Sequence, residues 1–237
     1  MTIFEKLSQL RQQIPPHVTL IAVTKGQPTT RIEEAWQAGQ RDFGENYAQE
    51  LLEHVGAALC GRPAREGTQA EGTHGGVPLQ ETTWHFIGHL QRNKVKQIID
   101  KVSLIHSVDS LRLAEEINHQ AAKLGKIQPI LIEVNLGEAT KSGIALAALD
   151  PLIRALSPLT HLELTGLMGM PPPASDPEAA RPHFKHLREI RDAINNKRVY
   201  KLPLTELSMG MTHDYQVAIE EGSTLVRIGT GIFGNRL

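Results

Sequence analysis

A single lysine at the end of an apolar run is the residue whose position favours the most specific chemistry. Lys25 follows the β-rich run 18–24 and is followed at once by Gly26. A lysine at a strand end is usually a solvated side chain on a long aliphatic stem. At the mouth of a barrel, however, partial loss of solvent favours the neutral amine, which is a nucleophile. An amine in that position is suited to forming a Schiff base with an aldehyde.

Two glycine-containing segments, 208–212 and 229–231, follow the last two apolar runs and predict a phosphate site. Glycine lets main-chain N–H groups approach an anion closely, and side-chain hydroxyls can donate as well. A helix starting near Thr212 would add the positive end of its dipole. The alternatives are tight turns for the glycines and a plain helix cap for Thr212. The residues of these segments that we expect at the site are Ser208, Met209, Gly229 and Thr230.

Arg227 lies inside the last apolar run, 224–228. A buried arginine needs a partner, because an unpaired buried charge is very costly. One interpretation is a structural ion pair with Glu206 or Glu45, and the other is a donor that faces a heteroaromatic nitrogen of a ligand. The G-x-G-x-x-G pattern at 229–234 does not indicate a dinucleotide site, because that fingerprint requires a further helix, a strand and an acid about twenty residues on.

The remaining metal-binding residue types do not have the spacing of a metal site. We expect satisfied or surface histidines instead, since none of them has an acidic partner at metal spacing and one cysteine is too few for a zinc site. These residues are Cys60, His74, His85, His89, His183 and His186.

Composition excludes several classes of protein. The chain has 237 residues, a formal net charge of −1 and one cysteine. A balanced charge gives no electrostatic footprint for nucleic acid, and no run approaches the roughly 18 apolar residues of a membrane span. The N-terminus does not resemble a secretory signal, and a single cysteine fits a reducing compartment. We therefore expect a cytoplasmic protein that binds neither nucleic acid nor membranes.

The chain alternates β-type runs with helical patterns, as in a single-domain α/β barrel. An amphipathic pattern at Leu7, Leu10 and Ile14 predicts an extra N-terminal helix. We expect one (β/α)8 TIM-type barrel over 1–237, with an open doubly wound sheet as the alternative. Its functional groups would lie at the carboxyl ends of the strands. The expected strands are 18–24, 42–45, 84–88, 103–108, 129–135, 161–167, 204–208 and 224–228.

Residues 56–82 interrupt this alternation. The segment is rich in glycine and proline and has no apolar period. We expect a flexible surface insertion within the barrel domain rather than a second domain.

Five ordered motifs together resemble the pyridoxal-phosphate homeostasis proteins, over essentially the whole chain outside 56–82. The motifs are VTK at 23–25, FGENY at 43–47, WHFIGHLQRNK at 84–94, LSMGM at 207–211 and GSTLVRIGT at 222–230. The resemblance implies a barrel like the N-terminal domain of alanine racemase, standing alone. It also implies binding of pyridoxal 5′-phosphate (PLP), with a role as carrier or regulator of the cofactor pool.

The resemblance further implies a role for individual residues. Lys25 would form the Schiff base with PLP, Arg227 would face the pyridine nitrogen, and Asn46 would line the pocket. The residues at phosphate-binding positions are Ser208, Gly229 and Thr230. Gln27 stands where some relatives have a second lysine, which puts a transfer route through that lysine in doubt.

Three hypotheses follow. The first is a monomeric PLP carrier that serves PLP-dependent apo-enzymes, the second a slow PLP-dependent amino-acid racemase, and the third a module for another phosphorylated ligand. An arginine at the pyridine nitrogen disfavours its protonation and so weakens PLP as an electron sink. This argument favours the carrier without robust catalysis.

Overall fold

Eight parallel strands form a closed barrel in the order of the sequence, from β1 to β8. The computed structural model describes residues 1–60, 82–137 and 143–234, without the side chains of 57–60. The expected (β/α)8 barrel is confirmed, and every predicted strand is present. The strands are β1 Thr19–Val23, β2 Asp42–Glu45, β3 Thr83–Phe86, β4 Leu104–Val108, β5 Gln128–Val134, β6 Leu162–Gly169, β7 Glu206–Met211 and β8 Leu225–Ile228.

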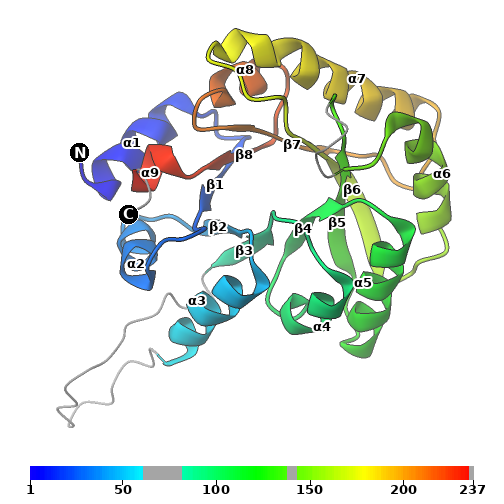
Figure 1. Cartoon of the computed structure of the whole chain (residues 1–237), viewed down its shortest axis with the longest axis horizontal. Helices are drawn as coiled ribbons and strands as arrows, with labels where there is room; N and C mark the ends of the chain where they lie inside the picture. The colour runs from blue at the N-terminus through cyan, green and yellow to red at the C-terminus, as the bar shows by residue number, and fades with distance from the viewer. Residues whose placement is uncertain (61–81, 138–142, 235–237) are drawn as a thin grey trace.

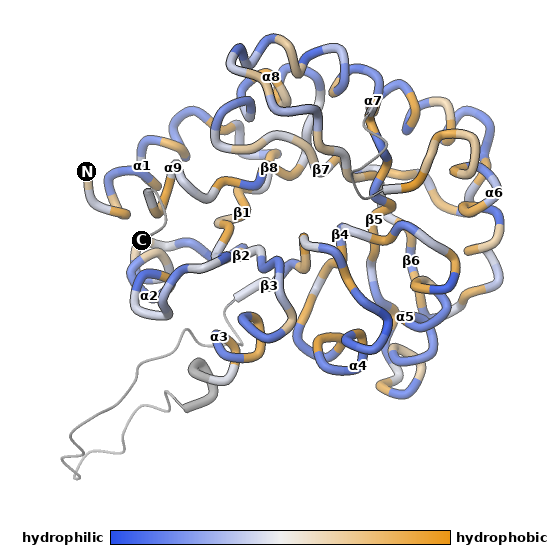
Figure 2. The backbone as a smooth tube through the Cα atoms, in the orientation of Figure 1, coloured by the Kyte–Doolittle hydropathy of each residue, from blue (hydrophilic) through white to orange (hydrophobic). Residues whose placement is uncertain are grey.

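Helices surround the strands in a ring (Figure 1). The tube in Figure 2 alternates between hydrophobic and hydrophilic residues along the helices, as expected for helices with one face on the barrel. The α-helices are α1 Ile3–Gln13, α2 Thr29–Gln37, α3 Ala48–Cys60, α4 Val95–Ile98, α5 Leu111–Lys123, α6 Leu146–Leu156, α7 Arg181–Asn196, α8 Tyr215–Glu220 and α9 Thr230–Phe233. The short 3-10 helices are η2 Arg92–Lys94 and η3 Pro177–Ala180.

The predicted N-terminal helix is α1, which precedes the first strand. Thr2 caps it, and the Thr2 and Glu5 side chains form a reciprocal capping box. Helix α1 packs against α2 and α9, so the first and last helices of the chain lie side by side (Figure 1). The hydroxyl of Tyr215 on α8 also donates to Gln13 at the end of α1.

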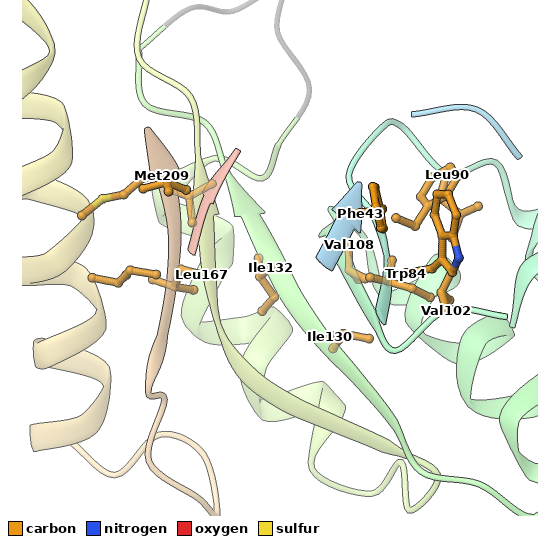
Figure 3. Packing of buried hydrophobic residues seen from close by; sticks show 14 of the residues in the cluster. Phe43, Trp84, Leu90, Val102, Val108, Ile130, Ile132, Leu167 and Met209 are labelled. Atoms are coloured by element: carbon orange, nitrogen blue, oxygen red, sulfur yellow. The ribbon is translucent and has the colours of Figure 1, made fainter. Parts of the chain in front are cut away.

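The strands separate two hydrophobic clusters because successive side chains point to opposite faces. On β5, Ile130 and Ile132 belong to the large cluster between strands and helices. Leu131 belongs to a small cluster inside the barrel. In Figure 3, Leu167 and Met209 point away from their strands toward the neighbouring helix. The inner cluster consists of Ile21, Leu104, Leu131, Met168 and Leu225.

The structure corrects the predicted boundaries near the insertion and at Thr212. Helix α3 continues to Cys60, so the interruption does not begin at 56; the predicted insertion over 61–81 lies outside the described residues. Helix α8 begins only at Tyr215, so Thr212 does not cap it. Within the described ranges, no helix is both long and apolar enough to cross a membrane.

We predict that Gly166→Ala and Gly56→Ala change stability in opposite directions. A Cβ at Gly166 in β6 would lie 2.0 Å from the main-chain oxygen of Glu206 on β7. Overpacking of this kind costs about 1–3 kcal/mol. A Cβ at Gly56 in α3 meets nothing within 4 Å, so alanine there should add about 0.5–1 kcal/mol through helix propensity. Urea unfolding of both variants measures the difference, and wild-type stability for Gly166→Ala would contradict this close approach.

Candidate functional site

Lys25 lies just beyond the carboxyl end of β1 and lines a cavity of about 730 Å³. Its Nζ atom is 4.9 Å from the centroid of the Tyr47 ring, at the distance of a cation–π contact. Gly26 adopts a left-handed φ of 67°, and its N–H donates to Glu50 at 2.7 Å. The lysine is therefore held between a tight turn and the start of α3.

A buried carboxylate ties the end of β1 to the end of β2. Glu45 is fully buried and accepts a hydrogen bond of 2.6 Å from the hydroxyl of Thr24, the residue before the lysine. Its other oxygen accepts from the main-chain N–H of Asn46 at 2.6 Å and of Tyr47 at 3.3 Å. His54 on α3 lies 3.5 Å from the same carboxylate. Glu45 therefore sets the positions of the residues on both sides of the Lys25 amine.

Asn46 lines the same cavity and provides an acceptor for a ligand. Its Oδ1 atom is buried and has no hydrogen-bond partner among the described residues. An unpaired buried acceptor is costly unless a ligand or water supplies a donor. The loop after β2, which contains Asn46, lies close to the loop after β3, because a Cβ at Gly88 would lie 2.2 Å from the main-chain oxygen of Asn46.

The loops after β7 and β8 are joined to each other and to β1. The hydroxyl of Thr212 bonds that of Thr230 at 3.1 Å and accepts from the N–H of Gly231 at 3.2 Å. Gly229 packs against Val23, with 3.4 Å between an ideal Cβ and the valine Cβ. The two predicted phosphate-binding segments are therefore adjacent, and the second lies beside the strand that positions Lys25.

Arg227 and Ser208 lie inside the barrel, below its mouth. Arg227 donates to the Ser208 hydroxyl at 2.5 Å and to the main-chain oxygen of Gly169 at 3.4 Å. Neither predicted ion pair forms, because Glu45 bonds Thr24 and Glu206 bonds Thr224. Burial lowers the pKa of Arg227 to about 10, while the carboxylates of Glu133 and Asp214 act to raise it. The guanidinium is therefore still charged at neutral pH.

Met209 differs from the other expected site residues. Its side chain is fully buried in the cluster outside the barrel and points toward the neighbouring helix (Figure 3). This follows from strand alternation, since the adjacent Ser208 points inward. Only the main chain of Met209 is placed to contribute to a site at the mouth.

Sequence reasoning missed Glu45 as a positioning group, Tyr47 as the ring beneath the lysine, and His106. His106 in β4 is fully buried and bonds Ser208 Oγ at 2.8 Å through Nδ1. A histidine two residues after the inward-pointing Leu104 was the available signal. Among the described residues, no group of His, Cys, Asp and Glu side chains could hold a metal ion.

We predict that His106 makes stability depend on pH. Burial, followed by the charges of His85 and Arg227, holds the pKa of His106 well below its usual range. The unfolded chain therefore takes up a proton on this residue below about pH 6.5 while the folded protein excludes it. Stability should be constant above that pH and should fall below it, by up to about 1.4 kcal/mol per pH unit from this group.

Urea unfolding between pH 7 and pH 5 measures this slope. His106→Asn should reduce it, whereas His119→Asn, which changes an exposed histidine on α5, should leave it unchanged. Equal slopes in wild type and His106→Asn would show that His106 is not kept neutral.

Comparison with known proteins gives one family across the whole chain. A family model described as the N-terminal domain of alanine racemase matches residues 2–236. The pyridoxal phosphate homeostasis protein of Aquifex aeolicus is 42% identical over 218 residues, which cover 92% of this chain and 86% of that protein. Its namesake in Escherichia coli K12 is 38% identical over 246 residues, covering 99% and 97%.

Solved structures give the same result. PipY of Synechococcus elongatus with PLP bound has a TM-score of 0.84 and 36% identity, covering 98% of this chain and all of that one. An alanine racemase of Clostridium difficile has a TM-score of 0.75 at 15% identity and covers 56% of that longer chain, which is a likeness of fold alone. The chain belongs to the pyridoxal phosphate homeostasis protein family, built on the barrel of the alanine racemase N-terminal domain.

Proposed function

We propose that this protein binds PLP at the mouth of the barrel and serves in PLP homeostasis, with Lys25 as the covalent anchor. The observation that carries the proposal is the Lys25 amine above the Tyr47 ring, in one cavity with the unpaired Oδ1 of Asn46. PLP supplies an aldehyde, to which an amine adds with loss of water to give a Schiff base. The residues at the mouth fit this group.

The phosphate of PLP would rest on the joined loops after β7 and β8. The Thr212–Thr230 bridge holds these loops together, and Gly229, which has no side chain, leaves its main chain accessible to an anion. Gly229 packs against the end of β1, so a ligand anchored on Lys25 can reach this loop. Backbone N–H groups would supply the donors, together with the hydroxyl of Thr212, which accepts from Thr230 and Gly231 and keeps its own hydrogen.

Arg227 would face the pyridine nitrogen and keep it unprotonated. A charged guanidinium repels a second positive charge, so the ring becomes a weak electron sink. This supports a carrier without robust amino-acid chemistry. We further propose that the protein is a cytoplasmic monomer that exchanges PLP with PLP-dependent apo-enzymes.

Slow racemisation of amino acids is the second candidate function. Racemisation needs a second acid–base group on the opposite face of the substrate from the lysine. Two of the three tyrosines are engaged elsewhere, Tyr200 with the N–H of Leu164 and Tyr215 with Gln13. Tyr47 is the third, and its ring lies against the Lys25 amine itself. An assay of amino-acid turnover by the PLP-loaded protein distinguishes the two, and ordinary enzymatic turnover would overturn the carrier proposal.

We predict that Lys25→Ala abolishes the visible absorbance of a PLP imine, because it removes the anchoring amine. Lys94→Ala is the matched control, since Lys94 lines the same cavity. Borohydride reduction followed by peptide mass spectrometry should place the PLP adduct on Lys25 in wild type and in Lys94→Ala. An adduct on Lys94 would show that the anchor is wrong, and wild-type protein without any imine would overturn the proposed function.

A further inference from the structure

A continuous row of hydrogen-bonded side chains crosses the barrel interior from Arg227 to its amino end. Arg227 donates to Ser208 at 2.5 Å, and Ser208 lies 2.8 Å from His106 Nδ1. His106 Nε2 lies 3.0 Å from His85 Nδ1, and His85 Nε2 lies 3.2 Å from Asp42 Oδ1. These five residues come from strands β8, β7, β4, β3 and β2. We call them the interior chain.

The hydrogen bonds of the interior chain all run in one direction, from donor to acceptor. A guanidinium can only donate, so the Ser208 oxygen accepts from Arg227, and we assign the Ser208 hydrogen to His106 Nδ1. The pKa of His106 is held well below its usual range, chiefly by burial, so the ring is neutral. With Nδ1 accepting from Ser208, its one hydrogen is on Nε2. That hydrogen is donated to His85 Nδ1. The hydrogen on His85 Nε2 is then donated to the Asp42 carboxylate, and every donor points from the cation toward the anion.

The two ends of the interior chain have different surroundings. The Asp42 side chain is 31% exposed and borders a cavity of about 530 Å³ at the amino end of the barrel, together with Arg11 and Arg41. Arg227 is buried, and the carboxylates that act on it are Glu133 from β5 and Asp214 from the loop after β7. The middle of the interior chain is out of contact with water, since Ser208 and His106 are fully buried and His85 is nearly so.

The Ser208 hydroxyl is hydrogen-bonded both as an acceptor and as a donor. It accepts from Arg227 and gives its only hydrogen to His106, so it has no hydrogen left to donate to a phosphate. Removing it would leave a buried guanidinium N–H without an acceptor, which the interior of a protein penalises. The geometry therefore makes Ser208 a positioning residue for Arg227.

We propose that the interior chain fixes the Arg227 guanidinium in place and thereby sets the protonation of the pyridine nitrogen of bound PLP. This inference rests on the proposed function, because it requires PLP with its ring nitrogen at Arg227. Four consecutive hydrogen bonds with a single donor direction, three of them fully buried, allow only one arrangement of the guanidinium. Ser208, His106, His85 and Asp42 would then influence the cofactor without touching it.

The first test needs no cofactor. Nitrogen-15 NMR of the histidine rings in the PLP-free protein should show His106 as the neutral Nε2–H tautomer. Asp42→Ala should change the His106 ring signals although the two residues are not in contact, whereas the matched Asp100→Ala, an exposed partner of Lys101, should not. A His106 imidazolium or Nδ1–H tautomer, or unchanged signals in Asp42→Ala, would overturn the interior chain.

The second test follows the absorbance of bound PLP as a function of pH. Ser208→Ala should raise the midpoint by about one pH unit, because a guanidinium no longer held at the ring opposes protonation of the pyridine nitrogen less. Ser223→Ala is the matched control: this hydroxyl is equally buried between β7 and β8 but donates to main-chain oxygens such as that of Met209.

The outcomes of the second test are separable. Coincident titrations of wild type and Ser208→Ala, with PLP bound in both, would overturn the inference and leave the proposed function intact. A wild type that forms no imine would instead overturn the proposed function, and the NMR result on the interior chain would remain.

Discussion

A full positive charge inside the barrel is the constraint on which the rest of the site depends. Water solvates a guanidinium far better than a protein interior does, so Arg227 must find its compensation within the fold. Among the described residues it finds a hydroxyl, a main-chain oxygen and the electrostatic attraction of two carboxylates, Glu133 and Asp214. Replacing buried charges by well-packed apolar residues is often neutral or stabilising. The charge is therefore better explained by a ligand than by stability.

The barrel is arranged in layers around this charge. The inner apolar cluster that contains Leu104 and Leu225 closes the middle of the barrel. His106 and Arg227 are each two residues further along the same strands, so they form the next layer. The mouth lies above, where Glu45 ties together the loops that position Lys25. Strand alternation and register determine which residues form each layer. Two residues on one strand, such as Leu225 and Arg227 on β8, therefore supply an apolar contact in one layer and a charged group in the next.

The sequence was sufficient to predict the strands and insufficient to predict the contacts between them. Runs such as 18–24 and 129–135 are β-rich and bounded by turn residues, so their strands were predictable. The end of α3 was not, because the glycine-rich composition begins before the helix stops at Cys60. The role of Glu45 was also beyond prediction, since its partner Thr24 follows a different strand, β1. Met209 was expected at the site together with its neighbour Ser208. Because successive side chains of a strand point to opposite faces, the Met209 side chain lies in the cluster outside the barrel instead.

The geometry also supports the proposal that a barrel like that of the alanine racemases holds PLP without robust catalysis. Capture of an aldehyde needs only a free amine, donors for the phosphate and one or two hydrogen-bond acceptors, and these are the roles proposed for the residues at the mouth. Catalysis on an amino acid also needs an acid–base group on the far face of the substrate, and a protonated ring assists it. In the proposed arrangement Arg227 would disfavour a protonated ring, and the bonding of Tyr200 and Tyr215 leaves Tyr47 alone among the tyrosines as an acid–base group. Tyr47 is half exposed and lies against the lysine, so the mouth is suited to release of a bound aldehyde more than to sequestered proton transfer.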